Sequence, residues 1–400
     1  MLSNIDKLHR IANKSERLII GLMSGTSLDG LDIALCAITG NGPGTNIQLL
    51  RFETIAYTAD FRSEVQTVFS KKQIDLEKLC MLNPWIALQH AAMVNGCLQK
   101  WNISNEDIDL IASHGQTIYH APQHRHQQNK FGHATLQIGD ADHLAFATGI
   151  ITISDFRQKN IAAGGEGAPL AVYGDYLLFG KKNTARVLLN VGGIANFTYL
   201  PAIDANEKLW CTDVGPGNGL MDAFMQANFT SLTYDKDAAL AGTGTIHEAL
   251  LIALKDDDFF KQPFPKTTGP ELFNLQYLQK AMLQSGTNNL SAEDTLATLN
   301  KFTADTIASA IQLCVKNNQA VPVYVSGGGL HNPLLMQHLR ELLPACDVRD
   351  ITETGINPDA KEAVLFALLA NECVGGNEQT FQGLSDEIPA VSMGKISFPD

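Results

Sequence analysis

The stretch Gly21-Leu-Met-Ser-Gly-Thr-Ser-Leu-Asp-Gly30 places three glycines, two serines and a threonine between two apolar runs, residues 18–20 and 31–38. This pattern predicts two strands joined by a tight turn with little side-chain bulk. Such a turn presents backbone N–H groups and hydroxyls on one side, which suits phosphate oxygens. Asp29 and Asp32 add carboxylates where a phosphate-bound Mg²⁺ needs ligands or ordered waters. A β-hairpin with a glycine-rich turn fits the same residues.

A second strand, glycine turn and strand follow later in the chain. Residues 186–191 form an apolar run that leads into Gly192 and Gly193, and residues 195–200 form the next run. A related order of elements begins again at Ile150. We therefore expect two related α/β halves with a mixed sheet in each, and a ligand at the carboxyl ends of the strands.

Neither turn matches the motifs of two large nucleotide-binding classes. The chain has no Gly-x4-Gly-Lys-Ser/Thr motif of P-loop NTPases and no strand-borne Gly-x-Gly-x-x-Gly motif of Rossmann domains. A third glycine run, Gly327-Gly328-Gly329, ends a predicted strand over residues 321–326. Three glycine turns in this order favour a nucleotide held between two domains, with its β- and γ-phosphates at the first two turns and its base near the third.

Hydrophobic periodicity predicts the other elements. Further strands are expected over residues 46–57, 107–113, 135–138 and 150–154. Helices are expected over residues 61–69, 75–101, 140–147, 170–179, 218–229 and 360–373, and through most of 230–320. Pro84 predicts a break in the second of these helices. Residues 2–12 predict a short amphipathic helix that covers a core edge or a subunit contact.

The composition is that of an ordinary globular protein, with 400 residues, 45% hydrophobic and 18% charged, enough for two or three domains. The net charge of −13 without a long basic run excludes nucleic acid and anionic membranes as expected partners, because both reward clustered Lys and Arg. Seven scattered cysteines without a CxxC pair indicate free thiols in a reducing compartment, so we expect a cytoplasmic protein. No apolar stretch reaches the ~20 residues that span a bilayer.

Residues 21–32 resemble the signature of the anhydro-N-acetylmuramic acid kinases, which belong to the superfamily of sugar kinases, actin and heat-shock chaperones. Further matching motifs follow in the family's order. They are Ser113-His-Gly-Gln-Thr117, Asp155-Phe-Arg157, Ala163-Gly-Gly-Glu-Gly-Ala-Pro-Leu170, Asn190-Val-Gly-Gly-Ile-Ala-Asn196, Asp213-Val-Gly-Pro-Gly-Asn218 and Ser326-Gly-Gly-Gly329. The resemblance implies a two-domain α/β fold of the actin-like ATPase type, with a mixed sheet in each domain and a nucleotide cleft between the domains.

The resemblance also implies a specific reaction. The family opens the 1,6-anhydro ring of 1,6-anhydro-N-acetylmuramic acid with water and phosphorylates the 6-oxygen from ATP, which gives N-acetylmuramic acid 6-phosphate and ADP in cell-wall recycling. A base must remove a proton from the water, and by motif that base is Asp175. Asp175 follows Pro169 by about one and a half helical turns, and a helix N-terminus stabilises nearby anions. A carboxylate must be ionised to act as a base.

The other site residues follow from the same motifs. Arg157, His114 and Glu362 are expected to bind the sugar, because a guanidinium can grip the lactyl carboxylate of the substrate and the other two match family positions near the sugar. Asp29 and Asp213 are expected near Mg²⁺, through water. The expected ATP contacts are Gly25, Thr26, Ser27, Leu28, Asp29, Gly30, Leu31, Asp32, Gly192, Gly193, Asn196, Gly215, Gly327, Gly328 and Gly329.

Structural roles fit several of these residues as well. Asp175 and Glu362 suit a solvated helix face, and Arg157 suits an ion pair with Asp155 or Glu166. Thr26, Ser27 and Asp213 suit turn capping. The histidine-rich stretch from His114 to His126 contains a four-residue spacing between His120 and His124, but Pro122 lies between them and no carboxylate or cysteine completes a metal set.

The expected organisation is an extension over residues 1–16, a first domain over residues 17–145 and 375–400, and a second domain over residues 146–374. The second domain is expected to hold Asp175, the second phosphate turn and the adenosine site. The family resemblance implies a homodimer. Two alternatives use the same scaffold: a nucleotide-switched binding ATPase like the heat-shock chaperones, and a kinase for another sugar.

Overall fold

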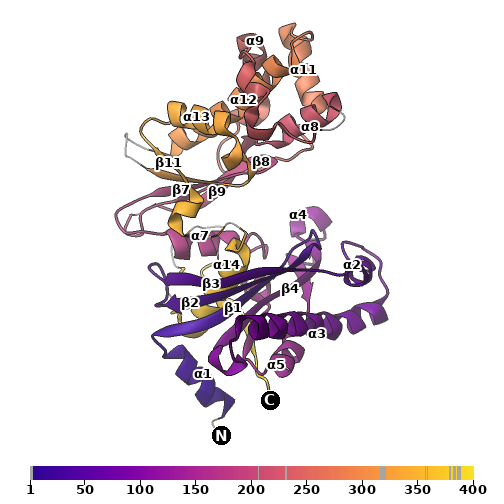
Figure 1. Ribbon diagram of the computed structural model, residues 1–400, viewed down its shortest axis with the longest axis vertical. Helices are drawn as coiled ribbons and strands as arrows, with labels where there is room; N and C mark the ends of the chain where they lie inside the picture. The colour runs from indigo at the N-terminus through magenta and orange to yellow at the C-terminus, as the bar shows by residue number, and fades with distance from the viewer. Residues whose placement is uncertain are drawn as a thin grey trace. The chain divides into compact units, whose positions relative to one another are not determined.

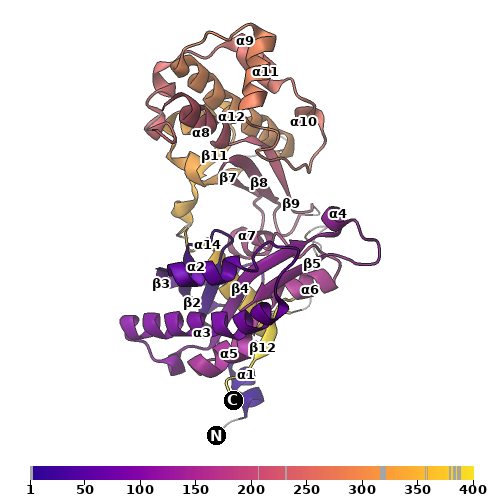
Figure 2. The same ribbon diagram turned by 90° about the vertical axis from the view of Figure 1, so that its right-hand side faces the viewer.

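Each half of the chain forms a mixed β-sheet of its own, with helices packed against it (Figures 1 and 2). The computed structural model describes residues 3–205, 207–229, 232–315, 321–355, 357, 359–377, 380–381, 384 and 389–400. The chain divides into a first unit, Met1–Phe179 with Asp359–Asp400, and a second unit, Gly180–Pro358.

Seven strands form the sheet of the first unit: β1 (Glu16–Ser24), β2 (Gly30–Thr39), β3 (Asn46–Ala56), β4 (Leu110–Ala121), β5 (Ala134–Ile138), β6 (Thr152–Ser154) and β12 (Lys395–Ser397). Their order is β12-β6-β4-β1-β2-β3, and β5 pairs with β4. β2 is antiparallel to β1 and to β3, whereas β4 is parallel to β1 and to β6.

The first unit extends further along the chain than the sequence predicts. We expected its first segment to end at residue 145, but it continues to Phe179. The physical reason is strand pairing, because β6 completes the parallel side of the sheet through its ladder with β4. Asp175 therefore lies in the first unit and not in the unit that carries the second glycine turn.

The helices of the first unit are α1 (Asn4–Ala12), α2 (Ala59–Gln66), α3 (Leu76–Trp101), α4 (Gln123–His126), α5 (Ala141–Thr148), α6 (Phe156–Ala162), α7 (Ala171–Phe179) and α14 (Lys361–Gly375), with a 3₁₀ turn over Asn105–Asp107. α3 and α14 lie on opposite faces of the sheet (Figure 1). Because side chains alternate along a strand, Ile20 and Leu22 enter the core that α3 helps to form, while Gly21 faces α14. A Cβ at Gly21 would lie 1.8 Å from the carbonyl oxygen of Ala363, so only glycine lets this helix approach.

The predicted break at Pro84 is wrong, because α3 runs through it as one helix. Proline removes one backbone hydrogen bond from a helix interior and crowds the preceding turn. That cost is outweighed here by burial on the face of α3 that includes Leu82, Ile86 and Ala87, all within the core of the first unit.

The predicted N-terminal helix is present as α1, and it covers an edge of the first unit. Ser3 and Asp6 form a capping box at its start. The buried guanidinium of Arg17 donates to the last carbonyls of α1, at Ile11 (2.8 Å) and Ala12, and to Oδ1 of Asn371 on α14 (2.9 Å). Arg17 thereby ties α1 to α14, whereas Ile5 of α1 stays 65% exposed.

The second unit contains the strands β7 (Arg186–Val191), β8 (Ile194–Leu200), β9 (Trp210–Pro216), β10 (Pro322–Ser326) and β11 (Asp347–Asp350). Its helices are α8 (Gly219–Asn228), α9 (Glu248–Lys255), α10 (Asp258–Lys261), α11 (Leu275–Ser285), α12 (Ala292–Cys314) and α13 (Pro333–Leu342), with 3₁₀ turns over Lys236–Ala238, Ala241–Thr243, Gly328–His331 and Ile351–Thr354. α12 and α13 pack on the sheet in one core, and a second core joins α8, α9, α11 and α12. The expectation of a helical segment between residues 230 and 320 is thus confirmed for its described part.

The two sheets share one topology. The order β3-β2-β1-β4-β6 of the first unit corresponds to β9-β8-β7-β10-β11 of the second. In both, the first and second strands are antiparallel, the second and third are antiparallel, and the fourth and fifth continue in parallel from the first. The predicted duplication of an α/β half around two glycine turns is therefore confirmed at the level of strand order and direction.

None of the helices in the described part of the chain has the length and apolar content needed to cross a membrane. All seven cysteines lie in described residues and all are free thiols.

Candidate functional site

The turn between β1 and β2 is closed by one aspartate. Oδ1 of Asp29 accepts hydrogen bonds from Oγ of Ser27 at 2.7 Å and from the N–H of Gly30 at 3.0 Å. The hydrogen bond from Ser27 lowers the pKa of Asp29, so this carboxylate is ionised. Leu28 has φ +56° and its side chain is buried in the core of the first unit. The turn is thus anchored by Leu28 and leaves the side chains of Thr26, Ser27 and Asp29 exposed.

A buried chain of polar side chains supports this turn from within. Oγ of Ser24 donates to Oε1 of Gln116 at 2.5 Å, so it accepts from the hydroxyl of Tyr57 at 2.6 Å. Tyr57 in turn accepts from Nε2 of His90 at 2.9 Å. Burial lowers the pKa of His90 to about 4, so the ring is neutral and carries its proton on Nε2. Nε2 of Gln116 donates to the carbonyl of Gly25 at 3.3 Å, which fixes the start of the turn.

Arg157 and His114 are brought together as expected for two residues of one site. Nε of Arg157, on α6, donates to Nε2 of His114, on β4, at 3.0 Å, and Nη1 donates to the carbonyl of Gly167 at 2.7 Å. Burial and the neighbouring Arg157 charge lower the pKa of His114 to about 3, so His114 is a neutral ring. The alternative ion pairs of Arg157 are not formed, because Asp155 pairs with Lys395 and Glu166 contacts His124.

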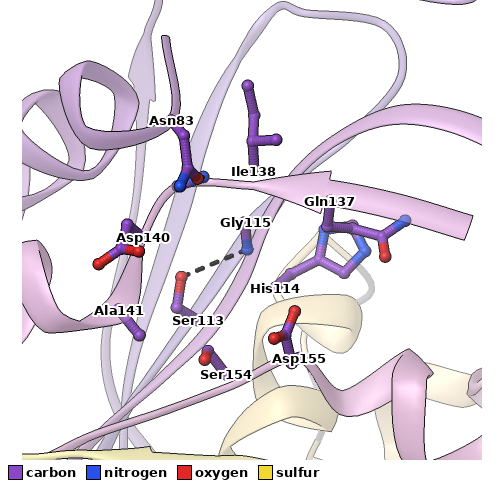
Figure 3. Close-up of a pocket in the computed structure, with 11 residues that line it drawn as sticks. Asn83, Ser113, His114, Gly115, Gln137, Ile138, Asp140, Ala141, Ser154 and Asp155 are labelled. Carbon is purple, nitrogen blue, oxygen red and sulfur yellow. Dashed lines mark hydrogen bonds between the residues drawn. The ribbon is translucent and has the colours of Figure 1, made fainter. Parts of the chain in front are cut away.

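A polar pocket lies beside this pair, at the ends of β4 and β5 and the start of α5 (Figure 3). Ser113, His114 and Gly115 line it from β4, and Asn83 and Asp140 line it from the opposite side, with Asp155 completing the wall. Its lining carries hydroxyl, amide, imidazole and carboxylate groups, which are the groups that bind sugar hydroxyls.

Asp175 lies on α7 and is 4% exposed, so it is not on a solvated helix face. Nζ of Lys361, the first residue of α14, lies 2.8 Å from Oδ1 of Asp175. The two groups are an ion pair, but Oδ1 receives no aligned hydrogen bond from any described residue. The carboxylate oxygen is therefore neutralised by a charge and still free to accept a proton.

Glu362 follows Lys361 on α14 and is likewise not a fully solvated residue. Burial raises the pKa of Glu362, Asp32 raises it further, and Arg157 acts in the opposite direction. Burial also raises the pKa of Asp32, on β2, although Oδ1 of Asp32 accepts a hydrogen bond from Thr54 at 2.6 Å. The α14 N-terminus thus carries charges that alternate in sign and reach both Asp175 and Arg157.

The second glycine turn is clasped by backbone hydrogen bonds within the second unit. The carbonyl of Gly192 accepts from the N–H of Asn218 at 2.8 Å, and the carbonyl of Gly193 accepts from the N–H of Gly217 at 2.9 Å. A Cβ at Gly217 would lie 2.2 Å from the carbonyl oxygen of Gly192. The motif around residues 213–218 therefore supports the glycine turn, and its helix, α8, begins only at Gly219.

The third glycine run meets the same place. Gly327 has φ +83°, and a Cβ there would lie 2.7 Å from the carbonyl oxygen of Val191, at the end of β7. A Cβ at Gly328 would lie 3.2 Å from Nδ2 of Asn218. The predicted association of the second and third glycine runs is therefore real within the second unit.

Asp213 lies in β9 opposite Asn196 of β8, and not in a turn before a helix. Its Oδ2 accepts from the N–H of Thr268 at 2.9 Å, and burial raises the pKa of Asp213. Gly215, two residues on, has φ +148° and lies against Thr306 of α12. Asn196, Asp213 and Gly215 thus share the β8–β9 ladder that adjoins the second glycine turn.

The histidine-rich stretch does not form a metal site in the described residues. His124 and His133 both approach Oε1 of Glu166, at 3.2 Å and 3.7 Å, and His126 contacts the carbonyl of Gly132. Across the described ranges, no cluster of three or more His, Cys, Asp or Glu side chains could hold a metal ion. A Mg²⁺ that arrives with ATP needs few protein ligands, because the phosphates supply oxygens.

A family model described as anhydro-N-acetylmuramic acid kinase matches residues 17–395. The chain belongs to this family. It is similar to the anhydro-N-acetylmuramic acid kinase of Pseudoalteromonas atlantica, with 57% identity over all of both chains. It is also similar to the enzyme of that name from Caldanaerobacter subterraneus, with 38% identity over 98% of this chain and 100% of the relative. The chain is therefore a kinase of the anhydro-N-acetylmuramic acid kinase family, and it uses ATP.

Among solved structures, the chain is similar to the activator of 2-hydroxyisocaproyl-CoA dehydratase from Clostridium difficile with bound ADPNP, at 13% identity and a TM-score of 0.40 over 89% of this chain and 95% of that one. The duplicated sheet with five strands in shared order is the stronger sign of the actin-like ATPase fold.

Several residues of the site were not expected from the sequence. Tyr57, His90 and Gln116 support the first turn, and Lys361 pairs with Asp175. Gln116 and Lys361 stand beside residues that were singled out, so motif neighbourhood could have pointed to them. Tyr57 and His90 carry no such signal, because they reach the turn only through the packing of α3 on the sheet.

Proposed function

We propose that the chain opens the 1,6-anhydro ring of 1,6-anhydro-N-acetylmuramic acid with water and transfers the γ-phosphoryl group of ATP to the 6-oxygen. The oxygen of water bonds to the anomeric carbon, the bond from that carbon to the 6-oxygen breaks, and the 6-oxygen takes the phosphoryl group as ADP leaves. The observation that carries this proposal is the buried carboxylate of Asp175 in the family's motif order.

Asp175 takes the proton of the attacking water. Its side chain is 6% exposed, which keeps the proton transfer away from bulk water, and its Oδ1 has no aligned hydrogen bond from the described residues. A base must lie within hydrogen-bond reach of the proton it removes and must be ionised. The ion pair with Lys361 supports the ionised form.

Arg157, His114 and Glu362 bind the sugar. The Nη2 group of Arg157 remains for the lactyl carboxylate, since Nε and Nη1 are already used by His114 and Gly167. His114 is neutral at physiological pH, and its Nδ1 has no hydrogen-bond partner among the described residues, so it suits a sugar oxygen and not a charge. The polar pocket beside the pair would take hydroxyl or amide groups of the sugar.

ATP contacts are assigned to the first turn, at residues 25–32, and to the second unit at Gly192, Gly193, Asn196, Gly215 and the glycine run at 327–329. The ionised Asp29 and the exposed hydroxyls of Thr26 and Ser27 suit phosphate oxygens and their hydrated cation. Mg²⁺ would neutralise phosphate charge, with Asp29 and Asp213 acting on it through water. Catalysis on this assignment is positioning together with charge neutralisation.

Sugar-dependent release of ADP tests the reaction. A coupled assay with the anhydro sugar and ATP should release ADP, and an open-ring amino sugar should not replace the anhydro sugar. The product should carry ¹⁸O at the anomeric carbon when the reaction runs in H₂¹⁸O, because water supplies that oxygen. Release of ADP at equal rates with open-ring sugars would favour a kinase for another sugar.

The residue assignment needs its own test. Asp175→Asn keeps the size of the side chain and removes the base, so turnover should be lost while ATP binding is retained. Asp142, an exposed residue in the first turn of α5, offers a matched control as Asp142→Asn. Substantial turnover by Asp175→Asn overturns the assignment of the base.

Two further properties belong to this proposal. We assign the protein to the cytoplasm because its seven cysteines are free thiols. We also propose a homodimer, as the family resemblance implies, and sedimentation equilibrium of the purified protein tests it.

A further inference from the structure

The ion pair between Asp175 and Lys361 joins two helices of the first unit. Nζ of Lys361 lies 2.8 Å from Oδ1 of Asp175, and the two side chains are 26% and 6% exposed. Lys361 begins α14, and the ring of Phe179, at the end of α7, lies 5.9 Å from the same ammonium. The aliphatic part of Lys361 is therefore partly covered, and its charge is directed toward Asp175.

Charge is what a buried carboxylate needs. Burial favours the protonated form of an acid, and a protonated Asp175 cannot take a proton from water. A cation within ~4 Å reverses this preference. The other charged groups on the packed elements do not supply it: Glu362 of α14 carries the same sign as Asp175, and Arg157 of α6 is engaged by His114 and Gly167.

The contact leaves the carboxylate usable. Oδ1 of Asp175 receives no aligned hydrogen bond from the described residues, so the ammonium acts through its charge. A strong donor bond to this oxygen would have competed with the water that must be deprotonated. The geometry thus separates keeping the base ionised from occupying its lone pairs.

We propose that Lys361 is a positioning residue for the reaction, which holds the Asp175 carboxylate ionised and fixed on α7 while leaving it free to accept the proton of the attacking water. This inference rests on the proposed role of Asp175 as the base. Lys361 itself exchanges no proton with substrate.

The test is the pH dependence of kcat/KM for the anhydro sugar in Lys361→Met, Lys361→Arg and the parent protein. Lys361→Met removes the charge and keeps the apolar stem, so the acid limb should move up by about one pH unit or more, with at least a tenfold loss at pH 7. Lys361→Arg restores a cation and should return the acid limb to within about 0.3 unit of the parent. A purely structural role of Lys361 would lower the rate at every pH without moving the limb.

Lys395 offers a matched control. It forms an ion pair of similar length, 2.7 Å, with Asp155 and is 65% exposed. Lys395→Met should leave the acid limb unchanged. Thermal unfolding and ADP binding, measured for every variant, show whether it is folded, and Lys361→Gln replaces Lys361→Met if the latter does not fold.

The outcomes separate the two proposals. If Asp175→Asn is inactive and Lys361→Met has the parent's acid limb, the role of Lys361 is wrong and the base stands. If Asp175→Asn retains turnover, the base itself is wrong. Higher activity of Lys361→Met at pH 7 also overturns the role of Lys361, since it would mean that the lysine blocks the carboxylate.

Discussion

Nε of Arg157 donates to Nε2 of His114 at 3.0 Å, so a buried cation and a neutral ring form a single hydrogen-bonded pair between α6 and β4. The bond uses the lone pair of the ring, and the arginine keeps a further nitrogen for another acceptor. Both side chains come from motifs separated by about forty residues, and the strand pairing of β6 with β4 brings them together.

Replacing Arg157 by lysine should weaken sugar binding selectively. Lysine keeps the charge but cannot hold His114, Gly167 and a substrate carboxylate at once. We expect the KM for the anhydro sugar to rise about 10- to 100-fold, which corresponds to ~1.4–2.8 kcal/mol, with the KM for ATP nearly unchanged. Steady-state kinetics with each substrate varied measures this split.

The matched control is Arg62→Lys, because Arg62 is an exposed residue of α2. It should leave both KM values unchanged. An equal rise of both KM values in Arg157→Lys would point to a general loss of structure and contradict a specific role in sugar binding.

Stability should fall as the pH is lowered below the ordinary pKa of histidine. Burial lowers the pKa of His90 to about 4, and burial with Arg157 lowers the pKa of His114 to about 3. Between these values and about 6.5 the unfolded chain binds protons that the folded chain does not, so acid favours unfolding. Each histidine contributes a slope of up to ~1.4 kcal/mol per pH unit in this window.

Urea unfolding at pH 7, 6 and 5 measures this effect. His90→Gln should reduce the slope by about one proton, because glutamine does not titrate. His143→Gln is the control, since His143 is exposed on α5. The same slope in parent and His90→Gln would show that His90 is not the source.

Tyr57→Phe should loosen the first turn. The hydroxyl of Tyr57 links His90 to Ser24, and its loss leaves two buried polar groups without their partner. We expect a loss of ~1–3 kcal/mol in stability and a several-fold weaker affinity for ATP. Thermal unfolding and calorimetric titration with ATP measure the two effects, and Tyr234→Phe, at a residue 54% exposed, should change neither.

Gly217→Ala should damage the second glycine turn. Its Cβ would lie 2.2 Å from the carbonyl oxygen of Gly192, so the backbone of the turn must shift. We expect a lower melting temperature and loss of measurable ATP affinity. Gly242→Ala, where a Cβ meets nothing within 4 Å, is the control and should keep both properties. Normal ATP binding by Gly217→Ala would remove this turn from the nucleotide site.

Some features were too local to be missed from the sequence. The turn at residues 21–30 and the turn at Gly192 and Gly193 each have the strand that precedes them and the strand that follows them within a few residues. Local pattern therefore predicted the two strand pairs and, from their repetition, the duplicated α/β arrangement that the sheets display.

Other features were misjudged because local rules compete with burial. Pro84 is unfavourable inside a helix, yet α3 continues because its apolar face is buried in the core. The first unit was expected to stop at residue 145, but β6 belongs to its sheet, and a three-residue strand carries almost no signal of its pairing partner.

By itself the sequence determined the family, the order of the glycine turns and the identity of Arg157, His114 and Asp175 as candidates, because these depend on residues that are neighbours along the chain. Only the tertiary structure decided what those residues touch. The pair of Arg157 with His114, the chain from His90 to Ser24 and the contact of Lys361 with Asp175 join residues 43, 66 and 186 positions apart. Contacts of that separation arise from the packing of helices on a sheet, for which a single sequence carries no local pattern.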